Sequence, residues 1–457
     1  MTNTKRDISH ISCEIEDRIN YQSNLLTFEK ELINNKNKII LNDTIPEDAS
    51  GSFVKNMSLP IHRWFRYSAG FSAEWVESII TKYQIDGELN VFDPFVGSGT
   101  VLIACEHCGA NGLGIDSHPF ISRISHAKLQ WRTNVKEFIN FATQVKRKAQ
   151  TIHGKLDDYP EIIKKCYPSE ILIKLDSLKK GLELHSDNSP QSELTWLALA
   201  SILRITSPVG TSNMELIQPK KQKKIYLEPF QAFSKQINDM ADDMIKMQTE
   251  ARGPKAIIYQ DDARTCLKVE NNWANLVITS PPYVNNFDYA DATRLEMSFF
   301  KEIDNYGDLQ KKVRVHLMRS CTQHVSNTDD WRNLIDDIIL KPIKDELIEI
   351  CNTLEKERLN HGGKKNYHIM VASYFYDIAH VWQSLRRICK SDSNVCFVIG
   401  DSAPYGIYIP VEKWLGELAI NSGFKNYTFE KTRDRNIKWK NRKHKVLLHE
   451  GFLWVKG

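Results

Sequence analysis

Four consecutive residues, Ser280, Pro281, Pro282 and Tyr283, form the most chemically informative pattern in this chain. They follow an apolar run at 275–279 that predicts a short buried strand ending in a rigid turn. Because each proline fixes φ and lacks an N–H group, the carbonyls of the turn stay available as acceptors. A hydroxyl and free carbonyls beside an aromatic ring suit a planar group with an exocyclic NH2. An ordinary turn with a packed tyrosine has the same signature, so the interpretation needs further motifs.

A glycine-rich segment at residues 91–100 connects a predicted strand to a predicted helix. Glycines let the backbone approach a ligand closely, and a helix N-terminus adds free N–H groups. The segment is neither a P-loop, because no Gly-Lys-Ser/Thr follows, nor the dinucleotide fingerprint G-x-G-x-x-G. Asp93 at the strand end suits a ligand with a cationic amino group.

Two further predicted strands end at carboxylates. Asp116 ends the strand at 112–116, and an acidic residue at this offset can accept hydrogen bonds from both ribose hydroxyls of a nucleoside. Asp261 and Asp262 follow the strand at 256–260. A carboxylate there could accept a hydrogen bond from the N6 amine of an adenine, with Asp262 the better candidate and Asp261 still possible. Adjacent aspartates in a loop are more often simply solvated.

Together these segments resemble the DNA amino-methyltransferase family, which uses S-adenosylmethionine to methylate an exocyclic nitrogen. The resemblance implies that the glycine-rich segment binds the methionine end of the cofactor, with Asp93, Pro94, Phe95, Gly97, Gly99 and Thr100 as the expected contacts. It also implies that Asp116 holds the ribose and that residues 280–283 hold a flipped target base. Residues 67–75 are similar to the helix that completes the cofactor pocket in this family, with Phe71 and Ser72 as expected contacts. The resemblance covers about half of the chain, at residues 58–130, 255–300 and 366–457.

Ser280, the first residue of the catalytic motif, indicates the target base. In this family Ser is commonest there in N4-cytosine enzymes, whereas Asp or Asn is commoner in N6-adenine and RNA enzymes. We therefore expect methylation of N4 of a flipped cytosine in duplex DNA, by the modification enzyme of a restriction–modification or other defence system. An N6-adenine DNA methyltransferase or an RNA base methyltransferase with the same core is the alternative. Intact motif residues disfavour a non-catalytic protein, and basic runs disfavour a small-molecule methyltransferase.

Composition is that of an ordinary soluble globular protein, with 41% hydrophobic and 26% charged residues in a chain of 457. No long apolar run or signal-peptide core is present, so we expect a cytoplasmic protein without membrane contact. The nine cysteines lack paired spacing. Cys105 and Cys108 share a predicted helix and indicate buried small residues rather than a zinc site, and the expected mechanism needs no metal. The chain is too short to include a nuclease as well, so any cognate restriction endonuclease would be a separate protein.

The net charge of +4 is modest, but the basic residues are clustered. One basic run lies at 219–224, and a second lies at 431–445 with Trp439 among its lysines and arginines. Each Lys or Arg placed on a phosphate adds salt-sensitive affinity for nucleic acid. Beside a base-modifying site, DNA contact is a better interpretation of these runs than a solvated loop.

The alternation of strands and helices predicts a doubly wound, Rossmann-like α/β sheet, mostly parallel, with an antiparallel C-terminal hairpin and an inserted, mainly helical domain. We expect strands near 90–93, 112–116, 256–260, 275–279, 394–400, 425–431 and 446–455. The predicted division is an N-terminal extension at 1–57, core segments at 58–130, 251–300 and 366–457, a helical insertion at 131–250 and a second insertion at 301–365. Either insertion could recognise the target. The first is favoured, although the second carries Lys311, Lys312, Arg314 and Arg319.

Overall fold

The computed structural model describes residues 53–67, 70–84, 87–211, 217–223, 225–326, 329–435 and 446–457. These residues lie in one compact unit, Ser50–Gly457. The predicted N-terminal extension lies almost entirely outside the described residues, as do Ser68 and Ala69 of the expected cofactor helix.

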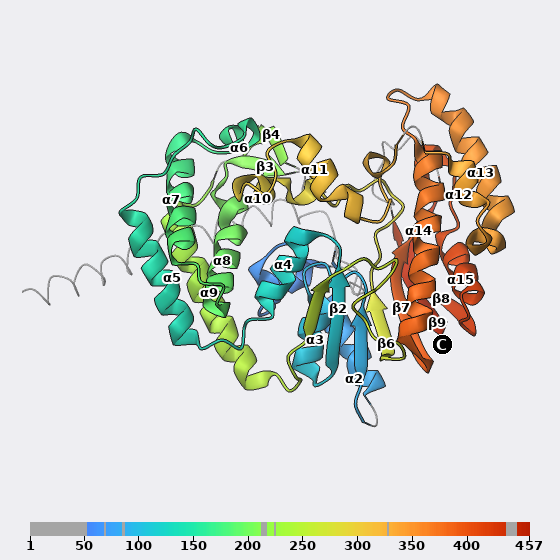
Figure 1. The fold of residues 1–457 in the computed structure, drawn as a ribbon, viewed down its shortest axis with the longest axis horizontal. Coiled ribbons are helices and arrows are strands. Elements are labelled where there is room, and N and C mark those ends of the chain that lie inside the picture. The colour runs from blue at the N-terminus through green and yellow to red at the C-terminus, as the bar shows by residue number, and fades with distance from the viewer. Residues whose placement is uncertain are drawn as a thin grey trace, which may run out of the picture. The chain divides into compact units, whose positions relative to one another are not determined.

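In the described part of the chain, a sheet of seven strands has the order β5-β2-β1-β6-β7-β9-β8 (Figure 1). The first five strands in this order are parallel, β9 runs antiparallel to β7, and β8 runs antiparallel to β9. The predicted fold class and C-terminal hairpin are therefore confirmed. The strands are β1 (Asn90–Asp93), β2 (Asn111–Asp116), β5 (Ile257–Gln260), β6 (Ala274–Thr279), β7 (Cys389–Gly400), β8 (Asn426–Arg435) and β9 (Leu448–Lys456).

The central strands are apolar throughout because both faces of the sheet are covered. On one face, Val91, Leu276 and Val398 pack with α2 (Ala73–Tyr83) and α3 (Thr100–Cys108). On the other face, the alternate strand residues pack with α14 (Tyr367–Ile388) and α15 (Val411–Asn421); they include Phe92, Val277 and Phe397. This burial holds the carboxyl ends of β1, β2, β6 and β7 at one edge of the sheet, where α/β proteins place their ligands.

The segment between β2 and β5 is mainly helical, as expected. A hydrophobic cluster joins these helices to Leu102 and Ile103 of α3 and to Trp64, so the segment shares its core with the sheet domain. The boundaries at 131 and 250 stay predictions. The helices are α4 (Pro119–Lys128), α5 (Val135–Gln150), α6 (Glu161–Cys166), α7 (Ser169–His185), α8 (Pro190–Thr206) and α9 (Pro229–Glu250), and a small hairpin joins β3 (Val209–Thr211) to β4 (Ile217–Gln222).

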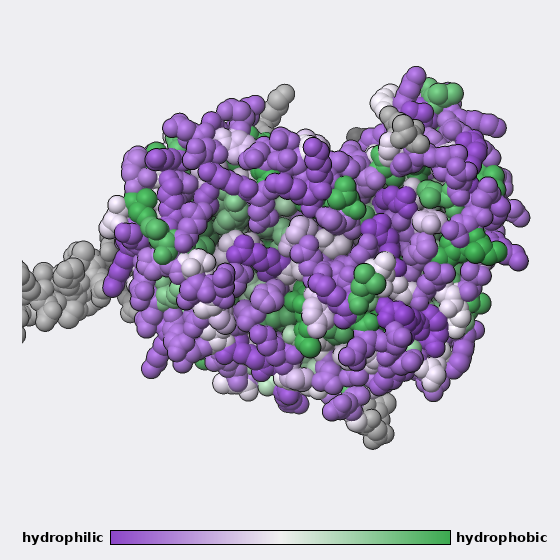
Figure 2. Space-filling model, viewed as in Figure 1, coloured by the Kyte–Doolittle hydropathy of each residue, from purple (hydrophilic) through white to green (hydrophobic). Residues whose placement is uncertain are grey.

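The chain between β6 and α14 forms short helices and 3-10 turns. Its later part, with buried Trp331, Ile335 and Leu347, joins the same cluster as α14 and extends the cover of the second sheet face. Its first part, with buried Phe299 and Leu309, packs with the helices between β2 and β5. The helices are α10 (Arg294–Phe299), α11 (Tyr306–Lys312), α12 (Trp331–Ile335) and α13 (Lys344–Glu357). The molecular face in Figure 2 is mostly hydrophilic with scattered apolar patches. None of the described helices has the length and apolar character needed to cross a bilayer.

Candidate active site at the carboxyl edge of the sheet

A pocket of about 530 Å³, including space open to solvent, brings together the two motifs predicted from the sequence. The predicted residues that line it are Phe95, Gly97, Asp116, Ser280 and Pro282. The glycine-rich segment and the catalytic turn therefore face the same cavity.

The glycine-rich segment folds into a tight turn at the start of α3. Gly97 and Gly99 adopt φ values of 54° and 89°, and Gly99 caps the helix. These left-handed conformations favour glycine because a Cβ atom would be strained there. The ring of Tyr67 lies 3.2 Å from the position that a Cβ on Gly97 would occupy, so the turn also packs closely against its neighbour. Close packing fixes the amides of the turn at the pocket wall.

Asp116 lies at the end of β2 and connects the turn to the next helix. Its Oδ2 accepts a hydrogen bond from the Gly97 amide and its Oδ1 accepts one from the His118 amide, each at 2.8 Å. Burial raises the pKa of Asp116 to about 6, although the two amides oppose this shift. Because a carboxylate has about four lone-pair sites, these two bonds leave capacity for ligand hydroxyls.

Asp93 connects the glycine-rich segment to the catalytic turn. Its Oδ1 accepts hydrogen bonds from the Thr279 hydroxyl at 2.6 Å and from the Phe95 amide at 3.0 Å. Thr279 immediately precedes Ser280, so this carboxylate sets the spacing between the two motifs. Burial raises the pKa of Asp93 to about 7. A buried carboxylate of this kind is stabilised by a nearby cation.

The catalytic turn is oriented by the strand beside it. The Ser280 hydroxyl donates to the Val398 carbonyl of β7 at 3.2 Å. The amide of Tyr283 donates to the Tyr289 hydroxyl at 3.3 Å. The guanidinium carbon of Arg435 lies 5.4 Å from the centre of the Tyr283 ring, within the range of a cation–π contact. Since its proton points to Val398, the Ser280 oxygen can act as an acceptor for a pocket ligand.

The structure places some predicted contacts away from the pocket lining. The Asp262 carboxylate pairs with Arg264 at 2.7 Å, so its expected contact with an adenine would compete with this ion pair. Phe71 and Ser72 are buried, and the Ser72 hydroxyl caps α2 by accepting from the Trp75 amide at 3.3 Å. Their roles stay predictions, as do those of the other predicted residues that are not part of the pocket lining: Asp93, Pro94, Gly99, Thr100, Pro281 and Tyr283.

Four residues of the pocket lining, Ser117, His118, Leu317 and Met318, were not predicted from the sequence. His118 follows Asp116, is buried, and has a pKa lowered by burial to about 4, so it is neutral. Leu317 and Met318 come from the second insertion. His118 could have been predicted as a pocket residue, because it lies two residues after Asp116, where β2 ends. No sequence pattern marks Leu317 and Met318, because a tertiary contact brings them to the pocket.

Two arginines that were candidates for target recognition instead fix this pocket wall. Arg314 pairs with Asp288 and Arg319 with Asp377, each at 2.5 Å. The hydrogen bonds from Arg314 and from His324 to Asp288 outweigh its burial and lower its pKa to about 2. These ion pairs flank residues 317–318 on both sides and thereby hold the second insertion against the catalytic turn.

Three basic side chains of these runs, those of Lys223, Lys431 and Arg433, make contacts within the protein. Lys223 donates to the Arg204 carbonyl of α8 at 2.6 Å, Lys431 pairs with Asp434 at 2.5 Å, and Arg433 pairs with Glu450 at 2.7 Å. The prediction that both runs contact phosphate is thus weakened for these side chains. Lys224 and the basic residues between 436 and 445 lie outside the described residues.

Comparison with known proteins agrees with this geometry. A family model described as DNA methylase matches residues 14–127, and one described as D12 class N6 adenine-specific DNA methyltransferase matches residues 73–348, more than half of the chain. The Type II methyltransferase M.BsoBI of Geobacillus stearothermophilus is 25% identical over 461 residues, which cover 89% of this chain and 87% of the relative. M.AvaI of Nostoc sp., also a Type II methyltransferase, is 26% identical over 399 residues, with 82% and 81% covered. From its motifs, its sheet order and these matches, the chain belongs to the DNA amino-methyltransferase family.

Proposed function

We propose that this protein transfers a methyl group from S-adenosylmethionine to N4 of cytosine in duplex DNA. The orientation of Ser280 supports transfer to an exocyclic amine, and the presence of Ser at this position of the motif favours cytosine. The Ser280 hydroxyl proton is directed to the Val398 carbonyl, which leaves the oxygen to accept from an NH2 group in the pocket. Asp116 of the expected cofactor site lines the same pocket, so donor and acceptor would meet there.

The residues of this edge fit S-adenosylmethionine. Asp116 presents a carboxylate for ribose hydroxyls, and buried Asp93 suits the cationic amino group of the methionine end. The amides at the start of α3 and the Phe95 side chain supply the close walls that a nucleoside needs. When bound, the cofactor supplies a methyl group on a positively charged sulfur, the electrophile of the reaction.

The role of the chain is to prepare the amine. The lone pair of an aromatic NH2 group is delocalised into the ring, which makes it a poor nucleophile. Hydrogen bonds from the amine to the Ser280 oxygen and the Pro281 carbonyl would favour a pyramidal nitrogen with a localised lone pair. Positioning then supplies much of the acceleration. Since the amine is inaccessible inside a duplex, the base must be flipped out and stacked on Tyr283, which offsets an unstacking cost of a few kcal/mol.

Methylation of adenine N6 in DNA is the second candidate. It is favoured by the description of the family model that matches residues 73–348. Ser280 favours cytosine, and the same hydrogen-bonding scheme would serve either amine.

The identity of the methylated base is directly testable. The protein is incubated with methyl-labelled S-adenosylmethionine and either duplex DNA, single-stranded DNA or RNA, and the products are digested and analysed by mass spectrometry. We expect N4-methylcytosine in duplex DNA. N6-methyladenine alone would overturn the cytosine assignment and support the second candidate, and label in RNA alone would overturn both.

Cofactor affinity should fall as the pH decreases. Burial raises the pKa of Asp93 to about 7 and that of Asp116 to about 6, so both carboxyls take up protons below neutral pH. A cationic amino group and ribose hydroxyls bind the ionised forms, so protonation weakens binding. We expect S-adenosylmethionine to bind about tenfold more weakly at about pH 6 than at about pH 7.5. Isothermal titration calorimetry tests this. Asp93→Asn should flatten the profile, and an equally steep profile in that variant would contradict the role of Asp93.

The biological setting follows from the relatives. M.BsoBI and M.AvaI are named Type II methyltransferases, and the matches span most of their length. We infer that this protein also modifies a specific DNA sequence in the cytoplasm, within a restriction–modification system whose endonuclease is a separate protein. Either insertion is a candidate for target recognition, and the contribution of Leu317 and Met318 to the pocket supports the second.

A further inference from the structure

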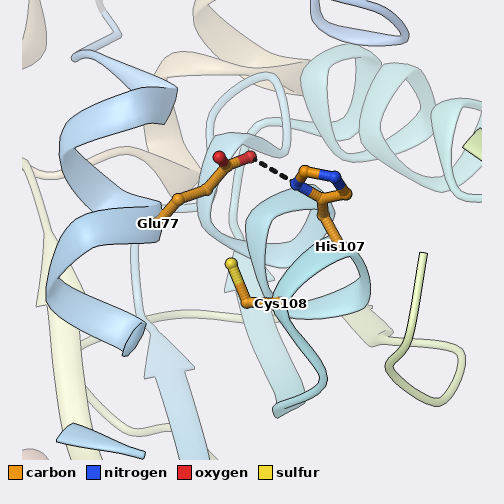
Figure 3. A group of neighbouring side chains, drawn as sticks. All are labelled: Glu77, His107 and Cys108. Carbon is orange, nitrogen blue, oxygen red and sulfur yellow. Dashed lines mark hydrogen bonds and ion pairs between the residues drawn. The ribbon is translucent and has the colours of Figure 1, made fainter. Parts of the chain in front are cut away.

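A second group of reactive side chains lies on the sheet face covered by α2 and α3. Glu77 projects from α2, and His107 and Cys108 lie at the end of α3, with the three side chains turned toward one another (Figure 3). Glu77 Oε1 lies 2.9 Å from His107 Nδ1. One ligand atom from each residue lies within 4.8 Å of the other two. This group lies outside the pocket described above.

The three side chains form a ligand set that suits a transition metal. Thiolate, imidazole and carboxylate all bind Zn²⁺, and a thiolate disfavours Mg²⁺ and Ca²⁺. Zinc–ligand bonds of about 2.0–2.3 Å in a tetrahedron place the ligand atoms roughly 3.5 Å apart. Glu77 and His107 are 2.9 Å apart and no two of the three ligand atoms are more than 4.8 Å apart, so shifts of about 1 Å would give this spacing.

A metal ion could also reach these three side chains from solvent. The side chains of His107 and Glu77 are 35% and 29% exposed, which leaves an entry path and room for water as a fourth ligand. Cys108 is half-buried, whereas the other cysteines of the described residues are buried. Cys105, its partner in the sequence pattern, is among these and takes no part. We propose that Glu77, His107 and Cys108 bind one divalent transition-metal ion, with Zn²⁺ the best-suited occupant.

Two comparable groups among the described residues are less suited to a metal. Asp288, Cys321 and His324 already have a cation, because Arg314 pairs with Asp288 at 2.5 Å. Asp401, Glu412 and His449 lack a sulfur ligand. Besides Glu77, the charges that act on His107 are those of Glu250 and Arg252, which have opposite signs.

The metal would connect α2 to α3, and α3 begins at the glycine-rich turn of the pocket. α3 begins beside Gly99 in the glycine-rich turn, and α2 begins at Ser72. Cys108 lies eight residues after Thr100, about 12 Å along the helix at 1.5 Å per residue. The ion is therefore too distant to touch the reacting atoms. Its expected role is to hold the two helices together, which does not depend on the base that the enzyme methylates.

Cobalt binding tests the proposal. Full-length protein is freed of metal by a chelator and titrated with CoCl2, and absorption is followed in the thiolate-to-metal charge-transfer region. We expect a band that saturates at one equivalent. Cys108→Ser should abolish the band, and His107→Gln and Glu77→Gln should each weaken binding by at least about tenfold. His153→Gln, a change of an exposed histidine elsewhere, is the matched control and should leave the titration unchanged.

Thermal unfolding gives an independent readout. At a hundredfold excess of ZnCl2 over its dissociation constant, the melting temperature should rise by about 3 °C for a chain of this length. Cys108→Ser should lose this rise while remaining folded by circular dichroism. Absence of a charge-transfer band in the native protein, or a band of equal strength in folded Cys108→Ser, would overturn the proposal.

Discussion

Replacing Ser280 with alanine is expected to lower the turnover number about 100-fold or more and to leave the affinity for S-adenosylmethionine nearly unchanged. The change removes an acceptor that acts on the amine during transfer, and loss of one such preorganised group typically costs about 10²–10³ in rate. The Ser280 hydroxyl bonds to Val398 rather than to Asp116 or the glycine-rich turn, so the expected cofactor contacts remain. Single-turnover kinetics and calorimetry measure the two effects separately.

A matched control for this prediction is Ser201→Ala. The Ser201 hydroxyl donates to a carbonyl of its own helix, Ala198, at 2.8 Å, and its loss should leave both quantities unchanged. Ser280→Asn retains an acceptor oxygen and should recover part of the rate. Equal losses of turnover and cofactor affinity in Ser280→Ala would mean that the turn does not hold the amine.

Replacing Asp116 with asparagine is expected to weaken binding of S-adenosylmethionine about 100-fold. Both carboxylate oxygens accept from backbone amides, those of Gly97 and His118. An asparagine has only one acceptor oxygen, so its NH2 group would face one of these N–H donors, and two opposed donors are unfavourable. The variant would therefore lose a ribose acceptor and displace the glycine-rich turn.

Binding is measured by calorimetry, with Asp187→Asn as the control because Asp187 is an exposed aspartate elsewhere. The DNA affinity of Asp116→Asn should stay close to that of the parent, because the change lies in the cofactor half of the pocket. If Asp116→Asn bound the cofactor as tightly as the parent, the assignment of Asp116 to the ribose would be wrong.

The sheet was largely predictable from the sequence because its strands are buried on both faces. Short apolar runs such as residues 275–279 predict central strands, and turn-forming residues mark where each run ends. Two features were not predictable. β7 begins at Cys389, five residues before the expected start, in a polar stretch that has no hydrophobic period. The β3–β4 hairpin is formed by a lysine-rich segment, Ile217–Gln222, whose composition predicts a loop.

The residues of the candidate site that lie at the ends of strands could be predicted from the sequence. Asp93, Asp116 and Ser280 each end a parallel strand or follow one, so their proximity is a property of the fold. The parts that were missed depend on side chains from distant segments. Leu317 and Met318 reach the pocket through ion pairs of neighbouring arginines, and Arg264 engages the carboxylate of Asp262. A run of charged residues in the sequence looks the same whether its side chains form internal ion pairs or a DNA-binding surface.

The hydrogen bonds that join the motifs also constrain how the protein is made. Thr279 and Asp93 are 186 positions apart, and Ser280 and Val398 are 118 apart. Loop closure must precede these contacts, so the site should assemble late and more slowly than the local helices of the insertion. A nascent chain on the ribosome cannot orient Ser280 until β7 has emerged, near the end of translation. Truncated products should therefore be inactive even when they contain every motif residue.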